Sequence, residues 1–265
     1  MSNKLKLTFE EYIKNPSGKG SSINTSRDTT AQFYQTKYDA IVARDGLVKY
    51  EVYRTASDVY YIHFHIPSNS TKGFTYDTVV EFTPNAEDPT ASKGNLKSYL
   101  VRFYSNDPNF NFTHAHAYHT HGLIIPEFEK KLSLTVKTSK ASTRNPDNAV
   151  GYVQSIYFAY LTMQKDNLFD KGILDRKATA GGANRFVRNV PTYKDKDREK
   201  NKFIEDQKRK SEPKNSREEL KPKVISSRFI GNGLSHIPVV SKITKTTKTS
   251  SAIKSTKSSK TTKRR

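Results

Sequence analysis

Six of the seven histidines lie in two short clusters, and imidazole is a common ligand of transition metals. The first cluster is the His-x-His of YYIHFHIP and the second lies in THAHAYHTHG; their members are His63, His65, His114, His116, His119 and His121. Alternate residues of a β-strand share one face, so each His-x-His pair would turn two imidazoles toward one ion. Two such strands side by side would offer enough nitrogen ligands for zinc, nickel or a two-histidine iron site.

A structural role for these histidines is the simpler interpretation, because the residues around them lack a catalytic partner. No Asp or Glu lies between Asp107 and Glu127. The residues that alternate with His63 and His65 are Ile, Phe and Ile, so the two histidines fit the polar face of a half-buried strand. We therefore predict no bound metal and no cofactor. A metal-dependent hydrolase or nuclease that uses both clusters is the alternative.

Other catalytic motifs are weak or missing. Asp107 followed by Glu129-Lys130-Lys131 matches the Asp and Glu-x-Lys pattern of some nucleases, but a lysine-rich chain contains so short a pattern by chance. The sequence SGKGSS resembles a phosphate loop only in part, because glycine follows the lysine where Ser or Thr is required. The chain has no cysteine, no G-x-S-x-G and no G-x-G-x-x-G. The sequence thus predicts a noncatalytic protein.

The strongest physical signal is the charge of residues 241–265, which include nine Lys or Arg and no Asp or Glu. The rest of this segment is almost entirely Ser and Thr, so it cannot bury a core and should stay extended. A polycation of this kind neutralises phosphates and releases counterions, which gives affinity without reading the base sequence. We predict non-specific contact with nucleic acid, DNA above all, through Lys242, Lys245, Lys248, Lys254, Lys257, Lys260, Lys263, Arg264 and Arg265.

Charge and aromatic residues divide the chain into parts. Residues 171–265 hold 27 Lys or Arg against 9 Asp or Glu, so they carry +18 of the net charge of +20. In contrast, 25 of the 29 Tyr and Phe residues precede residue 171. The sequence predicts a globular body over 1–172, a flexible charged linker over 173–223, an apolar docking segment over 224–240 and a disordered basic tail over 241–265.

The docking segment, VISSRFIGNGLSHIPVV, is apolar between two charged stretches. A segment of this kind can add a strand to the sheet edge of a partner, so a protein–protein adaptor is a further alternative function. It can equally pack on the protein's own body. The residues predicted to dock are Phe229, Ile230, Ile237, Val239 and Val240.

Capping residues and apolar periodicity predict the elements of the body. Thr8 and Glu11 fit a capping box at the start of a helix over 8–14. A short helix should begin at Ala31, and Asp45-Gly46 should form a hairpin turn. Alternating runs predict strands over 59–66, 74–82, 99–104, 110–118 and 132–136.

A long apolar helix over 146–171 should cover the open face of this sheet, because Asn145-Pro146-Asp147 is a typical helix start and apolar residues then recur at helical spacing. The predicted fold class is α+β: an antiparallel β-meander or small partial barrel packed by this helix, followed by an extended basic arm. No run reaches the ~20 apolar residues that span a bilayer, and the first residues lack the apolar core of a signal peptide. We therefore expect no membrane partner.

Three segments resemble small, poorly characterised proteins encoded by tailed bacteriophages: TFEEYIKNPSGKGSS, VRFYSNDPNFNFTHAHAYHTHG and GYVQSIYFAYLTMQKDNLF. The resemblance covers most of 8–170 and no part of the basic arm. It contains no catalytic motif, so it assigns no functional residue. It implies a viral protein, such as a minor virion structural protein, that is located in the virion or the host cytoplasm, has phage structural proteins as partners and can form oligomers.

Overall fold

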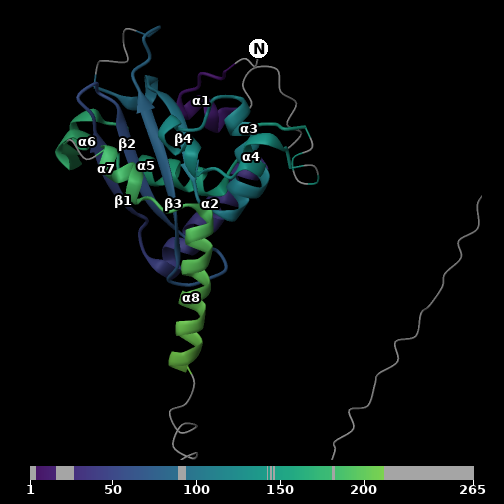
Figure 1. Cartoon of the computed structure of the whole chain (residues 1–265). Coiled ribbons are helices and arrows are strands. Elements are labelled where there is room, and N and C mark those ends of the chain that lie inside the picture. The colour runs from purple at the N-terminus through teal and green to yellow at the C-terminus, as the bar shows by residue number, and fades with distance from the viewer. Residues whose placement is uncertain are drawn as a thin grey trace, which may run out of the picture. The chain divides into compact units, whose positions relative to one another are not determined.

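Five strands form one sheet in the order β4-β3-β2-β1-β5, seen in the computed structural model of Figure 1. The structure describes residues 4–15, 27–88, 94–141, 143, 145, 147–180 and 183–211. Strands β1 to β4 are an antiparallel meander, and β5 pairs parallel to β1. The strands are β1 (Lys49–Arg54), β2 (Tyr60–Pro67), β3 (Thr75–Thr83), β4 (Leu100–Ser105) and β5 (Ala178–Ala180).

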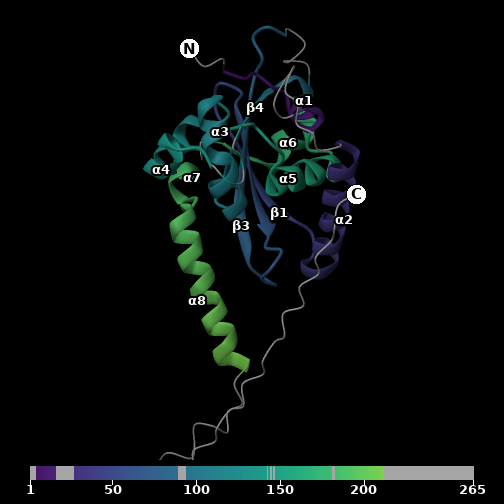
Figure 2. The same ribbon diagram turned by 90° about the vertical axis from the view of Figure 1, so that its right-hand side faces the viewer.

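Helices cover both faces of the sheet, with α2 and α5 on one side and α7 and α8 on the other (Figure 2). The α-helices are α1 (Phe9–Lys14), α2 (Arg27–Asp45), α3 (Ala115–Thr120), α4 (Leu134–Thr138), α5 (Gln154–Lys165), α6 (Lys171–Lys177), α7 (Ala183–Asn189) and α8 (Tyr193–Ser211). The other helical segments are two 3-10 helices, η2 (Leu96–Ser98) and η4 (Pro126–Lys131), and one π-helix, η3 (Phe110–His114). Within the described residues, no helix combines the length and apolarity needed to cross a membrane.

Alternation along the strands gives the sheet one apolar face and one polar face. On the apolar face, Phe9 of α1 joins the sheet to α5, since its ring lies 5.5 Å from that of Phe103 and 5.2 Å from that of Tyr160. On the polar face, α7 and α8 cover His63 and Asp77. One buried row of the apolar face crosses the four antiparallel strands in register: Val52, Ile62, Val80 and Phe103.

The predicted α+β class and the antiparallel meander are confirmed. The capping box is also confirmed, because the Thr8 hydroxyl accepts from the backbone N–H of Glu11 and the Glu11 carboxylate accepts from that of Thr8. The hairpin prediction at Asp45-Gly46 is wrong: α2 ends at Asp45, and β1 begins at Lys49. The predicted helix over 146–171 is only partly confirmed: α5 covers Gln154–Lys165, residues 147–153 are not helical, and the Asp170 side chain caps a separate helix, α6, where the predicted range ends.

Two predicted strands are helical. Across 110–118 the buried residues are Phe110, Thr113, Ala115, Ala117 and Tyr118, but Phe112 is exposed, and the backbone N–H of Ala115 donates to the carbonyl oxygen of Phe110 as in a helix. Across 132–136 the Ser133 hydroxyl accepts from the backbone N–H of Val136 and starts α4. The apparent alternation of Phe110 and Phe112 was therefore misleading.

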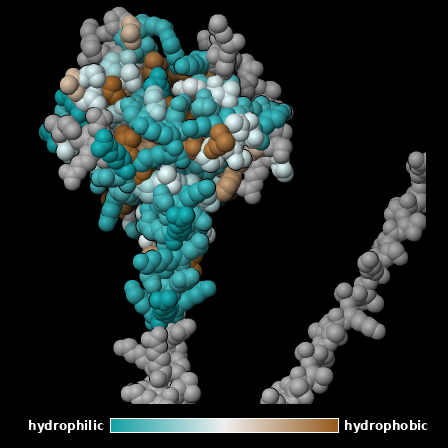
Figure 3. All heavy atoms as spheres, viewed as in Figure 1, coloured by the Kyte–Doolittle hydropathy of each residue, from teal (hydrophilic) through white to brown (hydrophobic). Residues whose placement is uncertain are grey.

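Residues 173–211 of the predicted linker form most of α6, then β5, α7 and α8. Two buried side chains attach this part to the sheet: Phe186 stacks on Tyr53 with ring centroids 4.4 Å apart, and Lys196 forms an ion pair with Asp77. The face of α8 that is visible in Figure 3 is mostly hydrophilic, and Phe203 of α8 packs on Phe74 with ring centroids 5.8 Å apart. The predicted docking segment 224–240 and the basic tail 241–265 lie outside the described residues.

Candidate metal centre

Strands β1, β2 and β3 bring two carboxylates to the first histidine pair. In the register of the sheet, Glu51 of β1 lies opposite His63 of β2, and Asp77 of β3 lies opposite His65. Residues opposite each other share a face, so all four side chains stand on the polar face. The structure thus supplies the carboxylates that are missing from the sequence around the histidines.

Asp77 binds both imidazoles through one oxygen. Its Oδ1 atom lies 2.9 Å from His63 Nε2 and 3.2 Å from His65 Nδ1. Its Oδ2 atom accepts from Asn106 Nδ2 at 2.9 Å and lies 3.3 Å from Lys196 Nζ. Burial alone would raise the pKa of Asp77, but the contacts with His63, His65, Lys196 and Asn106 outweigh burial and hold the pKa far below its usual range. Asp77 is therefore an anion that orients its neighbours.

The position of Asp77 fixes the tautomer of each imidazole. A carboxylate oxygen only accepts hydrogen bonds, so we assign the ring proton of His63 to Nε2 and that of His65 to Nδ1. The lone pairs then lie on His63 Nδ1 and His65 Nε2. His63 Nδ1 is buried and has no hydrogen-bond partner, in a side chain that is only 9% exposed. A buried nitrogen with a free lone pair is a ready ligand for a cation.

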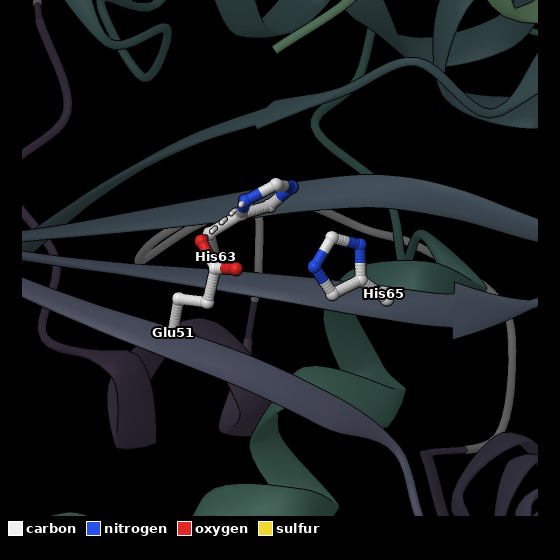
Figure 4. A group of neighbouring side chains, drawn as sticks. All are labelled: Glu51, His63 and His65. Carbon is white, nitrogen blue, oxygen red and sulfur yellow. Dashed lines mark ion pairs between the residues drawn. The ribbon is translucent and has the colours of Figure 1, made fainter. Parts of the chain in front are cut away.

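Glu51 completes the group on the solvent side. Its Oε2 atom lies 3.8 Å from His63 Nδ1, and one ligand atom from each of Glu51, His63 and His65 falls within 4.8 Å of the others (Figure 4). Two ligands at ~2.0–2.2 Å from one ion lie at most ~4.4 Å apart, so binding an ion would bring the three ligand atoms within that spacing. The Glu51 side chain is 54% exposed, so the group opens to solvent. Among the described residues, no other set of three such side chains comes this close.

The arrangement matches a two-histidine, one-carboxylate site with a second carboxylate behind the histidines. In such sites the ligand histidines donate their other N–H to an acceptor, which holds the ring and raises its basicity. Asp77 does this for both rings at once. Phe186 of α7 covers His63, with ring centroids 5.2 Å apart, and the Tyr53 hydroxyl donates to Glu51 Oε2.

The second histidine cluster does not join the first. His114 to His121 lie on η3, α3 and the residue after it, where neighbours two apart point in different directions. His116 Nδ1 is 2.8 Å from the carbonyl oxygen of Val136, and His119 Nδ1 is 3.5 Å from a Glu129 oxygen. His114 is largely buried, and burial lowers its pKa to about 4. The Nδ1 atoms of His114, His119 and His121 are also buried without a hydrogen-bond partner, but among the described residues these histidines do not gather with a carboxylate as Glu51, His63 and His65 do.

Comparisons of the chain with protein-family models, with curated proteins and with solved structures find no match. The resemblance to bacteriophage proteins therefore stays a prediction, and the functional interpretation rests on the site itself.

Proposed function

We propose that this protein is a divalent-metal-dependent hydrolase of phosphodiester bonds in nucleic acid, with the metal held by Glu51, His63 and His65. The observation that supports it is the buried, unpartnered Nδ1 atom of His63, which faces the Glu51 carboxylate. Buried polar atoms without a partner are rare in folded proteins, and a bound ion is one explanation for them. The second carboxylate, Asp77, gives both ring nitrogens the tautomer that metal binding needs.

The ligand set favours a transition metal ion. Two imidazoles and one carboxylate suit zinc, manganese, cobalt or ferrous iron, whereas calcium and magnesium prefer oxygen ligands alone. Three protein ligands with a solvent-exposed side leave coordination positions open, which is typical of catalytic sites and not of structural ones. The exposure of Glu51 provides that open side.

The substrate class follows from charge. The net charge of +20 attracts polyanions, and the exposed Lys49 lies opposite His65 in the register of β1 and β2. In hydrolysis, a water oxygen bonds to phosphorus while the bond from phosphorus to the leaving sugar oxygen breaks, and a proton of the water passes to that oxygen. The metal would supply Lewis acidity toward the phosphate, and Lys49 would offset its negative charge.

The test uses the full chain, treated with a chelator and reloaded separately with zinc, manganese or cobalt. We expect one metal ion per chain and cleavage of labelled DNA or RNA with at least one of them. His63→Ala and His65→Ala should lose both metal and cleavage. His116→Ala is the matched control and should keep both. A chain that binds none of the metals, or variants that cleave as well as the parent, would overturn the proposal.

A second candidate function is noncatalytic association with nucleic acid through 241–265, as in a phage nucleoprotein complex. The concentration of +18 of the net charge in residues 171–265 favours it. Ending the chain at Val240 should then abolish salt-sensitive DNA binding in gel-shift titrations, and equal affinity of both chains would exclude it. Detection of the protein in purified phage particles would test the virion setting, and crosslinking would test docking through 224–240.

A further inference from the structure

A groove on the surface combines exposed aromatic rings with lysines. It lies between η3, α4 and the first turn of α8 and has a volume of about 360 Å³. Its lining includes Phe112, Val136 and Tyr193, together with Lys131 and Lys194. None of the residues that line it is acidic. The groove therefore offers flat apolar surface and positive charge side by side.

Of the two aromatic residues of the groove, Phe112 is exposed and Tyr193 is half-buried. Phe112 is 55% exposed, whereas Phe110, two residues earlier, is fully buried. The rings of Phe112 and Tyr193 lie 4.9 Å apart at 80°, an edge-to-face contact in which the edge of one ring covers one face of the other. Exposed aromatic residues next to a hollow commonly mark a binding site, because burying them in a complex removes apolar surface from water.

Lysines supply the charge at both sides of the rings. Lys194 is exposed and follows Tyr193 directly in α8. Lys131 donates to the carbonyl oxygen of Val190. Its Nζ atom also lies 3.4 Å from the carbonyl oxygen of Arg188. These carbonyls hold the ammonium group beside the groove. Aromatic rings flanked by ammonium groups match the alternation of bases and phosphates along a nucleic-acid strand.

We propose that this groove binds the bases of single-stranded nucleic acid, with Phe112 and Tyr193 stacking on bases and Lys131 and Lys194 contacting phosphates. The proposal rests on nucleic acid being the ligand in the proposed function, and it narrows the substrate to single strands. A duplex hides the faces of its bases, whereas a single strand can splay them onto aromatic side chains.

Two further features agree with a strand lying here. A smaller hollow of about 140 Å³ shares Phe112 and Val136 with the groove, so the path continues past the exposed ring. In the other direction, Tyr193 precedes by three residues the Lys196 that pairs with Asp77, which places Tyr193 one helical turn from the residue behind the two imidazoles.

The test measures binding by the chelator-treated full chain, so that cleavage cannot interfere. Fluorescence anisotropy would follow a labelled single-stranded oligonucleotide and the matching duplex as salt is raised. Phe112→Ala and Tyr193→Ala should each weaken single-strand binding about tenfold, or about 1.4 kcal/mol, and leave duplex binding unchanged. Tyr193→Phe keeps the ring and should bind like the parent. Phe112→Leu keeps apolar bulk without a flat ring and should lose affinity.

The matched control is Phe33→Ala. Phe33 is also an exposed aromatic residue with a lysine over its ring, since Lys37 Nζ lies 4.2 Å from the ring centroid. Its removal should change neither affinity. The groove proposal would be overturned if Phe112→Ala and Phe33→Ala changed single-strand affinity equally. It would also be overturned if Phe112→Ala weakened single-strand and duplex binding equally.

The outcomes also separate this proposal from the metal centre. If the chain binds no metal but Phe112→Ala weakens single-strand binding, the groove proposal stands and the hydrolase proposal is refuted. If the protein cleaves nucleic acid with a metal but neither aromatic substitution changes its single-strand affinity, the groove does not bind single strands and the proposed hydrolase stands.

Discussion

Asp77 is the residue on which the geometry of both imidazoles depends. One of its oxygens faces His63 and His65, and the other is held by Asn106 and Lys196. The Asn106 side chain also accepts from the backbone N–H of Asp77 at 2.8 Å, so the carboxylate has little freedom to turn. A rigid acceptor behind two ligands is what keeps their free nitrogens aimed at one point.

Replacing Asp77 by Asn should therefore weaken metal binding without removing a ligand. We expect a loss of about 10- to 100-fold in affinity, because a neutral amide oxygen is a weaker acceptor for the two rings than a carboxylate oxygen. Competition with a chromogenic chelator would measure the change. Asp39→Asn, at an exposed carboxylate of α2, should have no effect. An unchanged affinity in Asp77→Asn would mean that the imidazoles do not depend on Asp77.

His114 gives a prediction about pH. Burial lowers its pKa to about 4, while its pKa in the unfolded chain is about 6.5. The unfolded state therefore takes up a proton first as the solution is acidified, and stability present above pH ~6.5 is lost as the pH falls to ~4. His114→Gln removes this titration. Between pH ~6.5 and ~4, the free energy of unfolding of the parent should fall by up to about 3 kcal/mol more than that of His114→Gln, as measured by urea unfolding. If the free energy of unfolding of both chains depends on pH in the same way, the imidazole of His114 is not buried in its neutral form.

The predictable part of the candidate site was the shared face of His63 and His65, which follows from their spacing. The carboxylates were not predicted, because they depend on strand register. With Pro67 opposite Thr75, counting outward from the turn places Asp77 opposite His65. Glu51 could not be predicted as a member of the site, because Asp45-Gly46 was interpreted as a hairpin turn, whereas α2 ends at Asp45. That interpretation left β1 with the wrong partner.

At the scale of elements, the loop before α5 packs on η3 and α3 through a glycine. A side chain at Gly151 would place its Cβ atom 2.8 Å from Cε1 of the His114 ring. The carbonyl oxygen of Gly151 also accepts from the Tyr118 hydroxyl at 3.0 Å and the Tyr12 hydroxyl at 3.3 Å. Moving the loop to relieve the clash would stretch both hydrogen bonds.

Gly151→Ala should consequently destabilise the protein by about 1–3 kcal/mol, the usual cost of overpacking. In His114→Ala the space is open, so adding Gly151→Ala should cost much less. A double-mutant cycle by chemical denaturation measures the difference. Additive effects of the two substitutions would show that the ring and the glycine are not in contact.

The same region shows why the fold was only partly predictable. The strands of the meander β1 to β4 have alternating apolar residues, and three of the four were predicted within about a residue. In η3 and α3, Phe110 and Phe112 imitate a strand, but Phe110 is buried and Phe112 faces the groove. An exposed Phe112 close to a buried Phe110 does not follow the apolar period that sequence analysis uses.

At the scale of the molecule, the proposed metal centre joins elements that are distant in sequence. Its ligands come from β1 and β2, and Asp77 comes from β3. Asp77 in turn is held by Asn106, after β4, and by Lys196 of α8. An ion can bind all three ligands only when these strands are paired. Metal binding should therefore be linked to folding of the whole sheet and not to one loop.

This linkage predicts a rise in stability with metal concentration. At a free concentration about 100 times the dissociation constant, the free energy of unfolding should rise by about 2.7 kcal/mol, because the ion binds the folded chain and not the unfolded one. Urea unfolding of the full chain with zinc or manganese, against the same chain in chelator, measures it. His65→Ala removes a half-exposed ligand and should respond to neither metal, whereas His116→Ala should respond as the parent does. If no metal tested changes the urea midpoint of the parent chain, then Glu51, His63 and His65 do not bind an ion in the folded sheet.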